Sequence, residues 1–582
     1  MKQFLKFTLA TIVGIFLATV IGSFIFFGIL NSIASSANKP VKLEANSVYE
    51  LKMEGMLVDR SEDDPFSAAM QEVFGQSSMN VIGLDDVLAN IEKAKNDPNI
   101  LGIYLKGGIL QGGFASMKEI RDALIDFKTS DKFIIAYADT YTQSNYYLAS
   151  VADKVLVNPY GVVDFKGISA EVLFLKNTLD KIGVEMQIVK VGTYKSAVEP
   201  FINTSMSDAN REQVTAYTSS LWSTMLDGIS ASRGISKELL NSYADEMMML
   251  QQSEKLVQYK LADSLVYIDE VEGILKSYAS DYKLVKHSNL SKVPDNKKFS
   301  KSKIGVIYAV GGIDDPMSSD GIVSDKLVET IDKAAKDETV KAVVLRVSSP
   351  GGSAYGSEQI WRALMKLKEK KPLVVSMGDY AASGGYYIAC MADTIVAQPN
   401  TITGSIGIFG MIPNIEGLNN KLGLKYDGVK TNKMSDAIGI NRAFRPEERA
   451  LMQNYINSGY ELFVKRCADG RGMSVDAIKA IAEGRVWTGE AALNNGLVDV
   501  LGGIDEAVNI AAEMVDLTEY QIREFPAKED FATKLMKTFN TSIETRFMET
   551  LGGEQYRIWQ FMKSYDKTNG IQARMPYEVL FR

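Results

Sequence analysis

The sequence contains a single histidine, His287, among its 582 residues. A Ser-His-Asp triad would have to use this side chain, and a zinc site built from His and Cys would lack ligands. His287 lies in the polar, lysine-rich stretch KLVKHSNLSKVPDNKKFSKSK, which predicts a solvated side chain rather than a catalytic base. If the protein is a hydrolase, its general base should be another residue type.

The sequence also has few cysteines and no excess of positive charge. Cys390 and Cys467 are the two cysteines, and no CxxC or other metal-ligand spacing is present. Cys390 lies in an apolar run and is expected to be a small core residue. We therefore expect neither a metal nor another cofactor. The net charge of −8 argues against nucleic acid as a partner, because phosphate binding needs a basic face.

The N-terminus carries the one long uncharged run. Residues Phe7–Leu30 contain no charged side chain, and 24 helical residues span about 36 Å, which exceeds a hydrocarbon core of about 30 Å. Lys2 and Lys6 precede the run, so the N-terminus should stay in the cytoplasm and the bulk of the protein should lie outside. A cleaved signal peptide is the competing interpretation, but its apolar region would span only about 7–15 residues.

The chain repeats itself at an offset of 240 residues. FIIAYADTYTQSNYYLASVADKVLVNP (133–159) aligns with LVVSMGDYAASGGYYIACMADTIVAQP (373–399), and IEKAKNDPNILGIYLKGG (91–108) aligns with IDKAAKDETVKAVVLRVS (331–348). One fold therefore occurs twice, with a lysine-rich linker near 286–303 between the copies.

Each copy alternates strands with helices. AVVLRV (342–347) and LVVSM (373–377) are apolar runs of strand length, and Ile360, Leu364 and Leu367 between them recur at helical spacing. This order predicts an α/β fold with a mainly parallel sheet, whose functional residues lie in loops at the carboxyl ends of the strands.

Two such loops, RVSSPGGS (346–353) and GDYAASGGYY (378–387), should meet at one edge of the second sheet. Their glycine pairs permit close approach of backbone N–H groups, so Gly352 and Gly384 could form an oxyanion hole beside Ser383. A tight structural turn is the alternative interpretation of Ser-Gly-Gly. The first copy favours chemistry, because it has Gln143-Ser144-Asn145 at the aligned positions and so keeps the scaffold without the candidate nucleophile.

Without histidine, a serine nucleophile needs a lysine whose ammonium is destabilised by burial. VGTYKSAVEPF (191–201) offers Lys195 among small and apolar residues, whereas position 435, which aligns with it in the second copy, is a serine. Lys433 lies two residues from that aligned position and is the rival base. An ordinary surface lysine is the alternative interpretation for either residue.

These motifs, together with TGSIGIFG (403–410) and GRVWTGEAALNNGLVD (484–499), resemble the long, duplicated form of the bacterial signal peptide peptidase A family, also called protease IV. The resemblance covers roughly residues 1–520. It implies tandem Clp protease/crotonase-like repeats behind an N-terminal transmembrane helix, and a serine/lysine dyad spread over both repeats. The nucleophile falls on Ser383, the base on Lys195, and a lysine-orienting hydroxyl on Ser405.

The resemblance also implies an organisation, a location and a substrate. We expect an anchor at 1–38, a first repeat at 39–295 that supplies the lysine, a second repeat at 296–525 that supplies the serine, and a helical tail at 526–582. The family is similar in forming homotetramers on the inner (cytoplasmic) membrane, with the catalytic bulk on the periplasmic side. Signal peptides and other hydrophobic peptides are the expected substrates.

Other interpretations stay open at this stage. A crotonase-type acyl-CoA enzyme would use the same glycine-rich loops, and a non-catalytic membrane scaffold would use neither loop. In the tail, ATKLMKTFNTSIETRFMETL (532–551) has helical spacing, and ARMPYEVLFR (573–582) is apolar enough to dock in a groove, including the active site.

Overall fold

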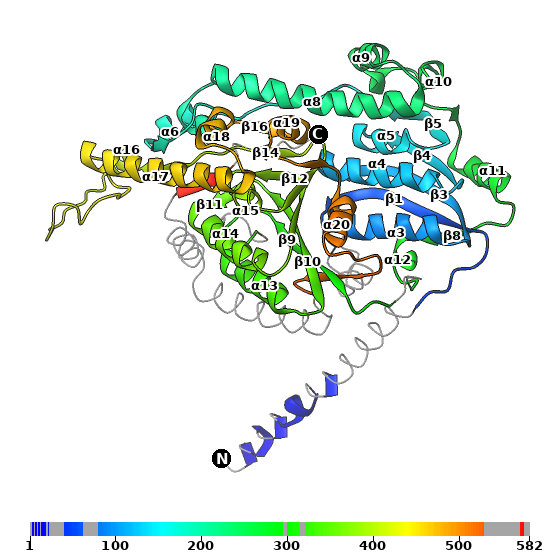
Figure 1. The fold of residues 1–582 in the computed structure, drawn as a ribbon, viewed down its shortest axis with the longest axis horizontal. Helices are drawn as coiled ribbons and strands as arrows, with labels where there is room; N and C mark the ends of the chain where they lie inside the picture. Colours follow the sequence, from blue (N-terminus) through cyan, green and yellow to red (C-terminus); the bar gives the residue numbers. More distant parts are fainter. Residues whose placement is uncertain are drawn as a thin grey trace.

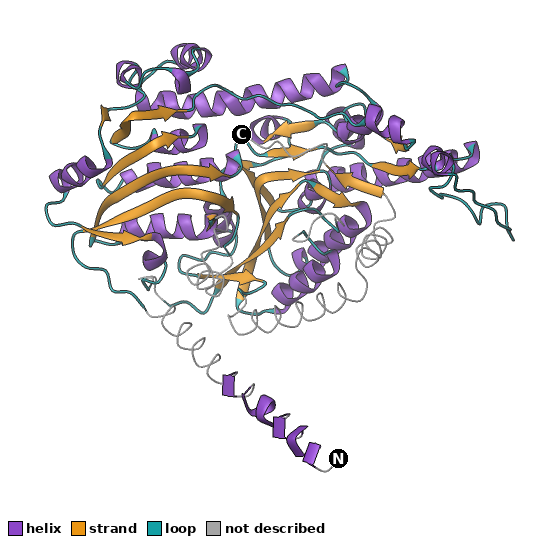
Figure 2. Ribbon diagram, turned by 180° about the vertical axis from the view of Figure 1, so that it is seen from behind, coloured by secondary structure: helices purple, strands orange, loops and turns teal. Residues whose placement is uncertain are grey.

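A computed structural model describes residues 40–61, 80–294, 299–314, 321–528 and 571–574, together with most of residues 3–22. It shows two α/β units side by side, with their helices packed around parallel sheets (Figures 1 and 2). The predicted α/β class with two parallel sheets is confirmed.

The first sheet is formed by residues 47–286 and is parallel throughout. Its order is β2 (Val81–Gly83), β1 (Ser47–Val58), β3 (Ile100–Gln111), β4 (Phe133–Tyr141), β5 (Lys154–Val163) and β7 (Ser264–Leu265), with β8 (Lys283–Lys286) also paired to β1. Its helices are α3 (Leu84–Asn96), α4 (Phe114–Lys128), α5 (Gln143–Ala149), α6 (Lys176–Ile182), α7 (Glu199–Ile202), α8 (Asp208–Arg233), α9 (Lys237–Asp245), α10 (Glu254–Gln258), α11 (Ile268–Tyr278) and α12 (His287–Leu290).

The second sheet is formed by residues 303–525. Its order is β16 (Val486–Thr488), β14 (Ile402–Gly404), β12 (Leu373–Ala382), β10 (Val340–Ser349), β9 (Lys303–Val310) and β18 (Gln521–Phe525), and β13 (Thr394–Ala397) joins β12 to β17 (Val500–Leu501). All these pairs are parallel except β14 with β16. Its helices are α13 (Ser324–Lys336), α14 (Ala354–Lys368), α15 (Gly384–Ala389), α16 (Glu416–Leu422), α17 (Pro446–Arg471), α18 (Val475–Ile481), α19 (Gly489–Asn494) and α20 (Ile504–Glu513).

The predicted strand, helix and strand of the second copy are confirmed as β10, α14 and β12. Ile360, Leu364 and Leu367 lie on one face of α14 and are completely buried, because apolar residues at this spacing form a stripe that packs against the sheet. The parallel register of β10 and β12 carries their carboxyl ends to the same sheet edge, as expected.

A third, antiparallel sheet joins the two units. Its order is β11 (Gly351–Ser353), β19 (Ile571–Arg574), β15 (Phe409–Asn414) and β6 (Glu185–Lys190). Strand β6 belongs to the first repeat, whereas β11 and β15 belong to the second. The first repeat therefore reaches over the second at the edge where RVSSPGGS and GDYAASGGYY lie.

A buried ionic cluster also connects the repeats. Arg346, in the second half of β10, contacts Asp59 and Glu119 of the first repeat, each at 2.7 Å. Burial disfavours the charged guanidinium, but the two carboxylates outweigh this effect and raise the pKa of Arg346. Beside it, the backbone N–H and the hydroxyl of Ser116 donate to Asp379 at 3.0 and 2.8 Å. These contacts fix how the repeats sit relative to one another.

The prediction for His287 is wrong. Its ring is half-buried, and Nδ1 accepts from the Tyr49 hydroxyl at 2.7 Å and from the Asn90 amide at 3.2 Å. Burial lowers the pKa of this imidazole. The predicted start of the linker near 286 is also too early, because α12 packs on the first repeat through the buried Leu290. The polar composition of this stretch gives no sign of α12, a short helix that buries one apolar side chain, Leu290.

At the N-terminus, the helical residues that the structure describes include no helix long and apolar enough to cross a membrane. Residues 23–30 of the predicted anchor and the predicted helix at 532–551 lie outside the described residues.

Candidate active site

Ser383 lies in the sharp turn between β12 and α15. Its φ and ψ are 56° and −113°, a region that costs a non-glycine residue on the order of 1–3 kcal/mol. Its N–H donates to the Gly404 carbonyl at 2.8 Å, and its own carbonyl accepts from the N–H of Tyr387 at 2.8 Å. The surrounding hydrogen bonds thus hold the side chain in a strained turn at the carboxyl end of a central strand.

Lys195 approaches Ser383 from the other repeat. It follows β6, and its Nζ lies 2.8 Å from Ser383 Oγ. Nζ also lies 3.1 Å from both the hydroxyl and the carbonyl oxygen of Ser405. All three side chains are fully buried. The structure therefore brings together the three residues that the sequence singled out as nucleophile, base and lysine-orienting hydroxyl.

The surroundings of Lys195 disfavour a charged amine. Among the residues that the structure describes, no carboxylate forms an ion pair with Lys195, and the hydrogen-bonding partners of its Nζ are serine oxygens. Burial alone lowers the pKa of Lys195 well below the ordinary 10.5. A neutral lysine amine can accept a proton, which a surface lysine at neutral pH cannot do.

Two glycines that the sequence analysis did not single out shape the lysine site. A Cβ on Gly484, whose φ is 77°, would lie 2.7 Å from the Cβ of Lys195, and a Cβ on Gly407 would lie 3.3 Å from its Cδ. Both residues belong to the quoted motifs, GRVWTGEAALNNGLVD and TGSIGIFG. The motifs were therefore the available signal, but only the fold shows that these glycines admit the lysine.

Gln213 on α8 is a further residue that sequence reasoning missed. Its buried amide nitrogen donates to the Tyr194 carbonyl at 3.0 Å and to the Ser196 hydroxyl at 2.9 Å, on either side of Lys195. Its amide oxygen accepts from the N–H of Val486 at 3.2 Å. The Gln213 side chain therefore links the residues on either side of Lys195 to Val486 of the second repeat.

The glycine pairs lie where close backbone approach is required. A Cβ on Gly352 would come within 2.1 Å of the Ile313 carbonyl oxygen, and a Cβ on Gly385 within 2.5 Å of the Ser349 carbonyl oxygen. Gly384 directly follows Ser383 as the first residue of α15. The two loops are therefore packed closely against each other around Ser383.

Neither Lys433, the rival base, nor Gln143, which aligns with Ser383 in the first repeat, has a contact like that between Lys195 and Ser383. Lys433 is exposed and pairs with Glu447 at 2.6 Å. Gln143, which aligns with Ser383, accepts through its amide oxygen from the N–H groups of Lys166 and Gly167 at 3.1 and 3.0 Å. The Gln143 side chain therefore holds the loop at residues 166–167 in place.

A segment of the chain's own tail lies across the site (red in Figure 1). Strand β19 is antiparallel to β11 on one side, with Gly352 opposite Ala573, and to β15 on the other, with Phe409 opposite Gln572. The apolar composition of residues 573–582 predicts that they dock in a groove. The backbone of residues 573 and 574 pairs with β11, while residues 575–582 lie outside the described part of the chain.

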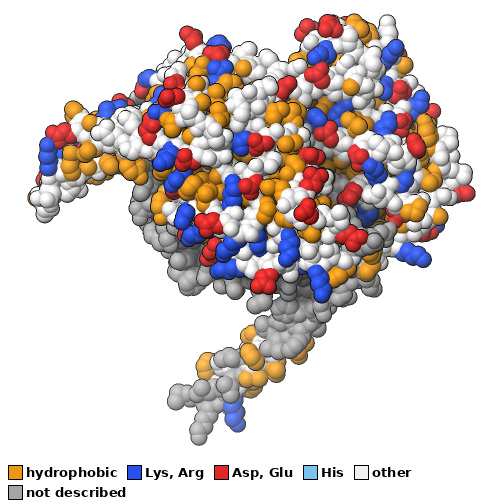
Figure 3. All heavy atoms as spheres, viewed as in Figure 1, with side chains coloured by type: hydrophobic (Ala, Val, Ile, Leu, Met, Phe, Trp, Pro, Cys, Tyr) orange, Lys and Arg blue, Asp and Glu red, His pale blue; other side chains and the backbone are white. Residues whose placement is uncertain are grey.

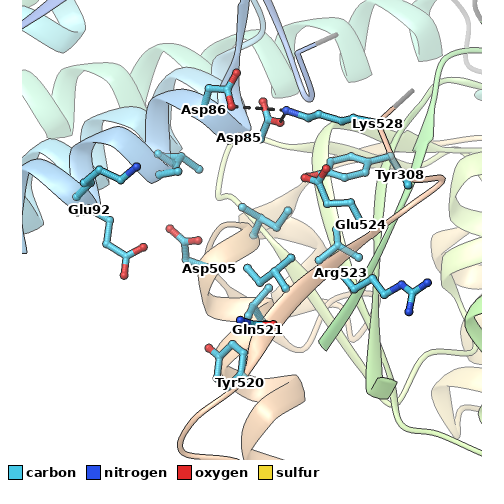
Figure 4. A pocket seen from close by; sticks show the side chains of 18 of the residues that line it. Asp85, Asp86, Glu92, Tyr308, Asp505, Tyr520, Gln521, Arg523, Glu524 and Lys528 are labelled. Carbon is cyan, nitrogen blue, oxygen red and sulfur yellow. Dashed lines mark hydrogen bonds and ion pairs between the residues drawn. The ribbon is translucent and has the colours of Figure 1, made fainter. Parts of the chain in front are cut away.

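A separate cavity of about 980 Å³ lies between α3 of the first repeat and β18 and α20 of the second (Figure 4). Its charged side chains include Asp85 and Asp86, which lie 3.0 and 3.6 Å from Lys528 Nζ. Ser383, Lys195 and Ser405 do not line it. The cavity is therefore distinct from the candidate active site.

Comparison with known proteins identifies the family of this chain. The family model described as Peptidase family S49 matches residues 126–280 and 365–518, one match in each repeat. Protease 4 of Salmonella typhi is 37% identical over 90% of this chain and 87% of its own length, and Protease 4 of Haemophilus influenzae is 35% identical over 91% and 88%. The chloroplastic serine protease SPPA of Arabidopsis thaliana is 32% identical over 75% of this chain and 66% of its own length. The chain belongs to peptidase family S49 and is a serine protease built from a duplicated S49 domain.

Proposed function

We propose that this chain is a membrane-anchored serine endopeptidase in which Ser383 is the nucleophile and Lys195 its general base, and that it degrades cleaved signal peptides and other hydrophobic peptides. The observation that carries the proposal is the buried 2.8 Å contact between Lys195 Nζ and Ser383 Oγ. Its components come from opposite repeats, and the lysine has serine oxygens rather than carboxylates around it.

The contacts of Lys195 suit a neutral amine. Such an amine has two N–H donors and one lone pair. The two oxygens of Ser405 can accept the two N–H groups, which leaves the lone pair for the Ser383 proton. Ser405 thereby acts as a positioning residue that aims Nζ at the nucleophile.

The reaction then follows in two stages. Lys195 takes the proton as Ser383 Oγ attacks a peptide carbonyl, and the N–H groups of Gly352 and Gly384 stabilise the oxyanion. The lysine ammonium gives its proton to the leaving amine, and an acyl-enzyme remains on Ser383. Water, deprotonated by the same lysine, attacks that ester and restores the free serine.

The position of β19 supports a peptide substrate. An extended segment fits between β11 and β15 with antiparallel pairing on both sides, which is the way a peptide adds to sheet edges. Next to this segment, Phe409 of β15 packs with Ala197 and Val198, which follow Lys195 by two and three positions in the sequence. An apolar cluster beside the extended segment supports substrates with hydrophobic side chains.

The membrane location rests on the sequence. The uncharged run at 7–30 follows Lys2 and Lys6, which favours a single-pass anchor with a cytoplasmic N-terminus and a catalytic bulk on the periplasmic side. An enzyme held there would meet signal peptides at the bilayer from which they are released.

The test is hydrolysis of a hydrophobic fluorogenic peptide by the detergent-solubilised full-length chain. Ser383→Ala and Lys195→Ala should each lower turnover by at least about 10²-fold, the lower end of what a general base contributes. The matched control Lys433→Ala should keep wild-type turnover. Activity in Ser383→Ala would end the proposal, and turnover of coenzyme A thioesters in place of peptides would favour the acyl-CoA alternative.

A further inference from the structure

Arg485 of the second repeat contacts the residue that precedes Lys195. It belongs to GRVWTG, part of one of the motifs on which the family resemblance rests. Its guanidinium lies over the ring of Tyr194, with Cζ 4.7 Å from the ring centroid, and Nη1 donates to the Tyr194 hydroxyl at 3.0 Å. Because Tyr194 belongs to the first repeat, this contact crosses the junction between the repeats directly beside the lysine.

The same residue contacts the neighbours of Ser405. Its Cζ lies 4.7 Å from the ring centroid of Trp487 as well, so the guanidinium touches two aromatic rings. A Cβ on Gly404 would lie 2.7 Å from Trp487 Cδ1, which shows how closely the indole packs there. The Arg485 carbonyl also accepts from the N–H of Ser405 at 2.7 Å. Arg485 therefore contacts the immediate surroundings of both Lys195 and Ser405.

The backbone just before Arg485 extends this connection. The Tyr194 N–H donates to the Glu483 carbonyl at 3.0 Å. The Gly484 N–H donates to the Ile406 carbonyl at 2.8 Å. This turn of the second repeat is thus bonded both to the lysine segment and to the loop that carries the lysine-orienting hydroxyl.

The first repeat has different residues at the equivalent turn. Leu261 and Leu497 are equivalent, because the carbonyl of each accepts a tyrosine hydroxyl from the matching helix, α5 or α15. Counting back from this pair, Gly484-Arg485-Val486 corresponds to Met248-Met249-Leu250. The repeat without the serine nucleophile therefore lacks the arginine as well, which indicates that the shared scaffold does not require it.

The ion pair of Arg485 is the weaker part of its environment. Nη2 lies 2.9 Å from Glu212 Oε1 on α8, where 54% of the glutamate side chain is exposed against 23% of the arginine side chain. Charged side chains of both signs are spread over the face of the molecule in Figure 3, and an exposed pair on such a surface contributes little. The stacking of a planar guanidinium on two rings remains, and a lysine could not reproduce it.

We propose that Arg485 is a positioning residue for the serine/lysine dyad, which acts by stacking on Tyr194 and Trp487 and so keeps Lys195 buried in line with Ser383. This inference rests on the proposed function, because it concerns the base of that reaction. Arg485 acts through its neighbours and takes no part in proton transfer.

Loss of the stack should loosen the lysine segment and admit water to the amine. The charged and titratable groups that face this segment are Lys190, Tyr194, Glu212, Glu483 and Arg485. Burial is the cause of the lowered pKa of Lys195, so hydration should raise this pKa towards 10.5. Catalysis requires the neutral amine, and the acid limb of the pH–rate profile should therefore move to higher pH.

The experiment is the pH dependence of kcat and KM for a hydrophobic fluorogenic peptide with the detergent-solubilised full-length chain. Arg485→Ala should lower kcat at neutral pH at least about 10-fold with little change in KM, since misplacement of a catalytic group by 1 Å costs about 10²-fold. Its acid limb should lie about one pH unit higher, a part of the roughly 3–5 units that complete burial can produce. Arg485→Lys keeps the charge without the planar stack and should behave like Arg485→Ala.

Arg60→Ala is the matched control. Arg60 also crosses the junction between the repeats, lies 5.1 Å from the ring centroid of Tyr308 and pairs with Glu524 at 2.7 Å. Both of these partners line the separate cavity and not the active site. Arg60→Ala should therefore keep the kcat and the acid limb of the wild type.

A second variant does not depend on the folding of Arg485→Ala. Tyr194→Leu removes one ring and leaves Arg485 with Trp487 and Glu212. It should move the acid limb in the same direction, and the double variant should move it no further than Arg485→Ala does, because both changes break one contact. Additive shifts would contradict an action of Arg485 through Tyr194.

Two results for Arg485 would overturn the inference. An acid limb that stays in place in Arg485→Ala, even with a lower kcat, would show a purely structural loss, and full activity in Arg485→Lys would show that charge is the effective feature. The proposed function fails separately. Activity in Lys195→Ala would refute the base itself, whereas an inactive Lys195→Ala beside a wild-type profile for Arg485→Ala would refute only the role of Arg485.

Discussion

Replacement of Lys195 by methionine tests the state of the buried amine without any assay of activity. Lys195 is fully buried, and burial lowers its pKa well below the 10.5 of a solvated lysine. Methionine has similar length and carries no titratable group. The two proteins should therefore differ in how their stability depends on pH.

The sign and size follow from proton binding. Between the depressed pKa of the folded chain and 10.5, the unfolded chain holds one proton on Lys195 that the folded chain has released. The free energy of unfolding of the wild type then rises by about 1.4 kcal/mol per pH unit in this window, relative to Lys195→Met. The contribution is complete above 10.5 and is lost progressively as the pH falls towards the folded pKa.

The assay is equilibrium urea unfolding of both proteins at pH 8.5 and pH 9.5, one pH unit apart within that window. The wild type should gain about 1.4 kcal/mol on the variant over this interval. Lost hydrogen bonds to Ser383 and Ser405 change the offset between the proteins but not this slope. Lys433→Met, at an exposed lysine, should run parallel to the wild type. Parallel curves for Lys195→Met as well would refute a neutral buried lysine.

Three further substitutions test the room left for Lys195, the ionic contact between the repeats and the hydrogen bond from Lys195 to Ser405. Gly484→Ala, whose Cβ would strike Lys195, should lower peptide turnover at least about 10-fold, whereas Gly472→Ala, also at positive φ but facing open space, should leave turnover intact despite a strain of about 1–2 kcal/mol. Arg346→Met leaves two buried carboxylates unpaired and should cost about 3–5 kcal/mol in urea unfolding, and a smaller loss would mean that water reaches them. Ser405→Ala should lower kcat about 10-fold, the worth of one hydrogen bond of about 1.4 kcal/mol, and should also shift the pH profile; an unshifted profile would contradict contact with Lys195.

Local patterns in the sequence were sufficient for much of the scaffold. Apolar runs and helical spacing predict β10, α14 and β12, and the constant offset predicts two copies of one fold. The same comparison separates Ser383 from a structural turn, because Gln143 stands at its aligned position. His287 shows the limit of such reasoning. A lysine-rich composition predicted a solvated ring, but Tyr49 and Asn90, far away in the sequence, bury part of it.

The sequence by itself determined which residues could carry the chemistry, because a lone histidine excludes the usual base and the repeat leaves the serine in one copy and the lysine in the other. Only the tertiary structure decided that they meet. Lys195 and Ser383 are 188 residues apart in the chain, and their contact depends on an arm of one repeat that pairs with a strand of the other and on a glycine that leaves room for the lysine. The lowered pKa of Lys195 results from this burial, because the same lysine on a protein surface would stay charged at neutral pH.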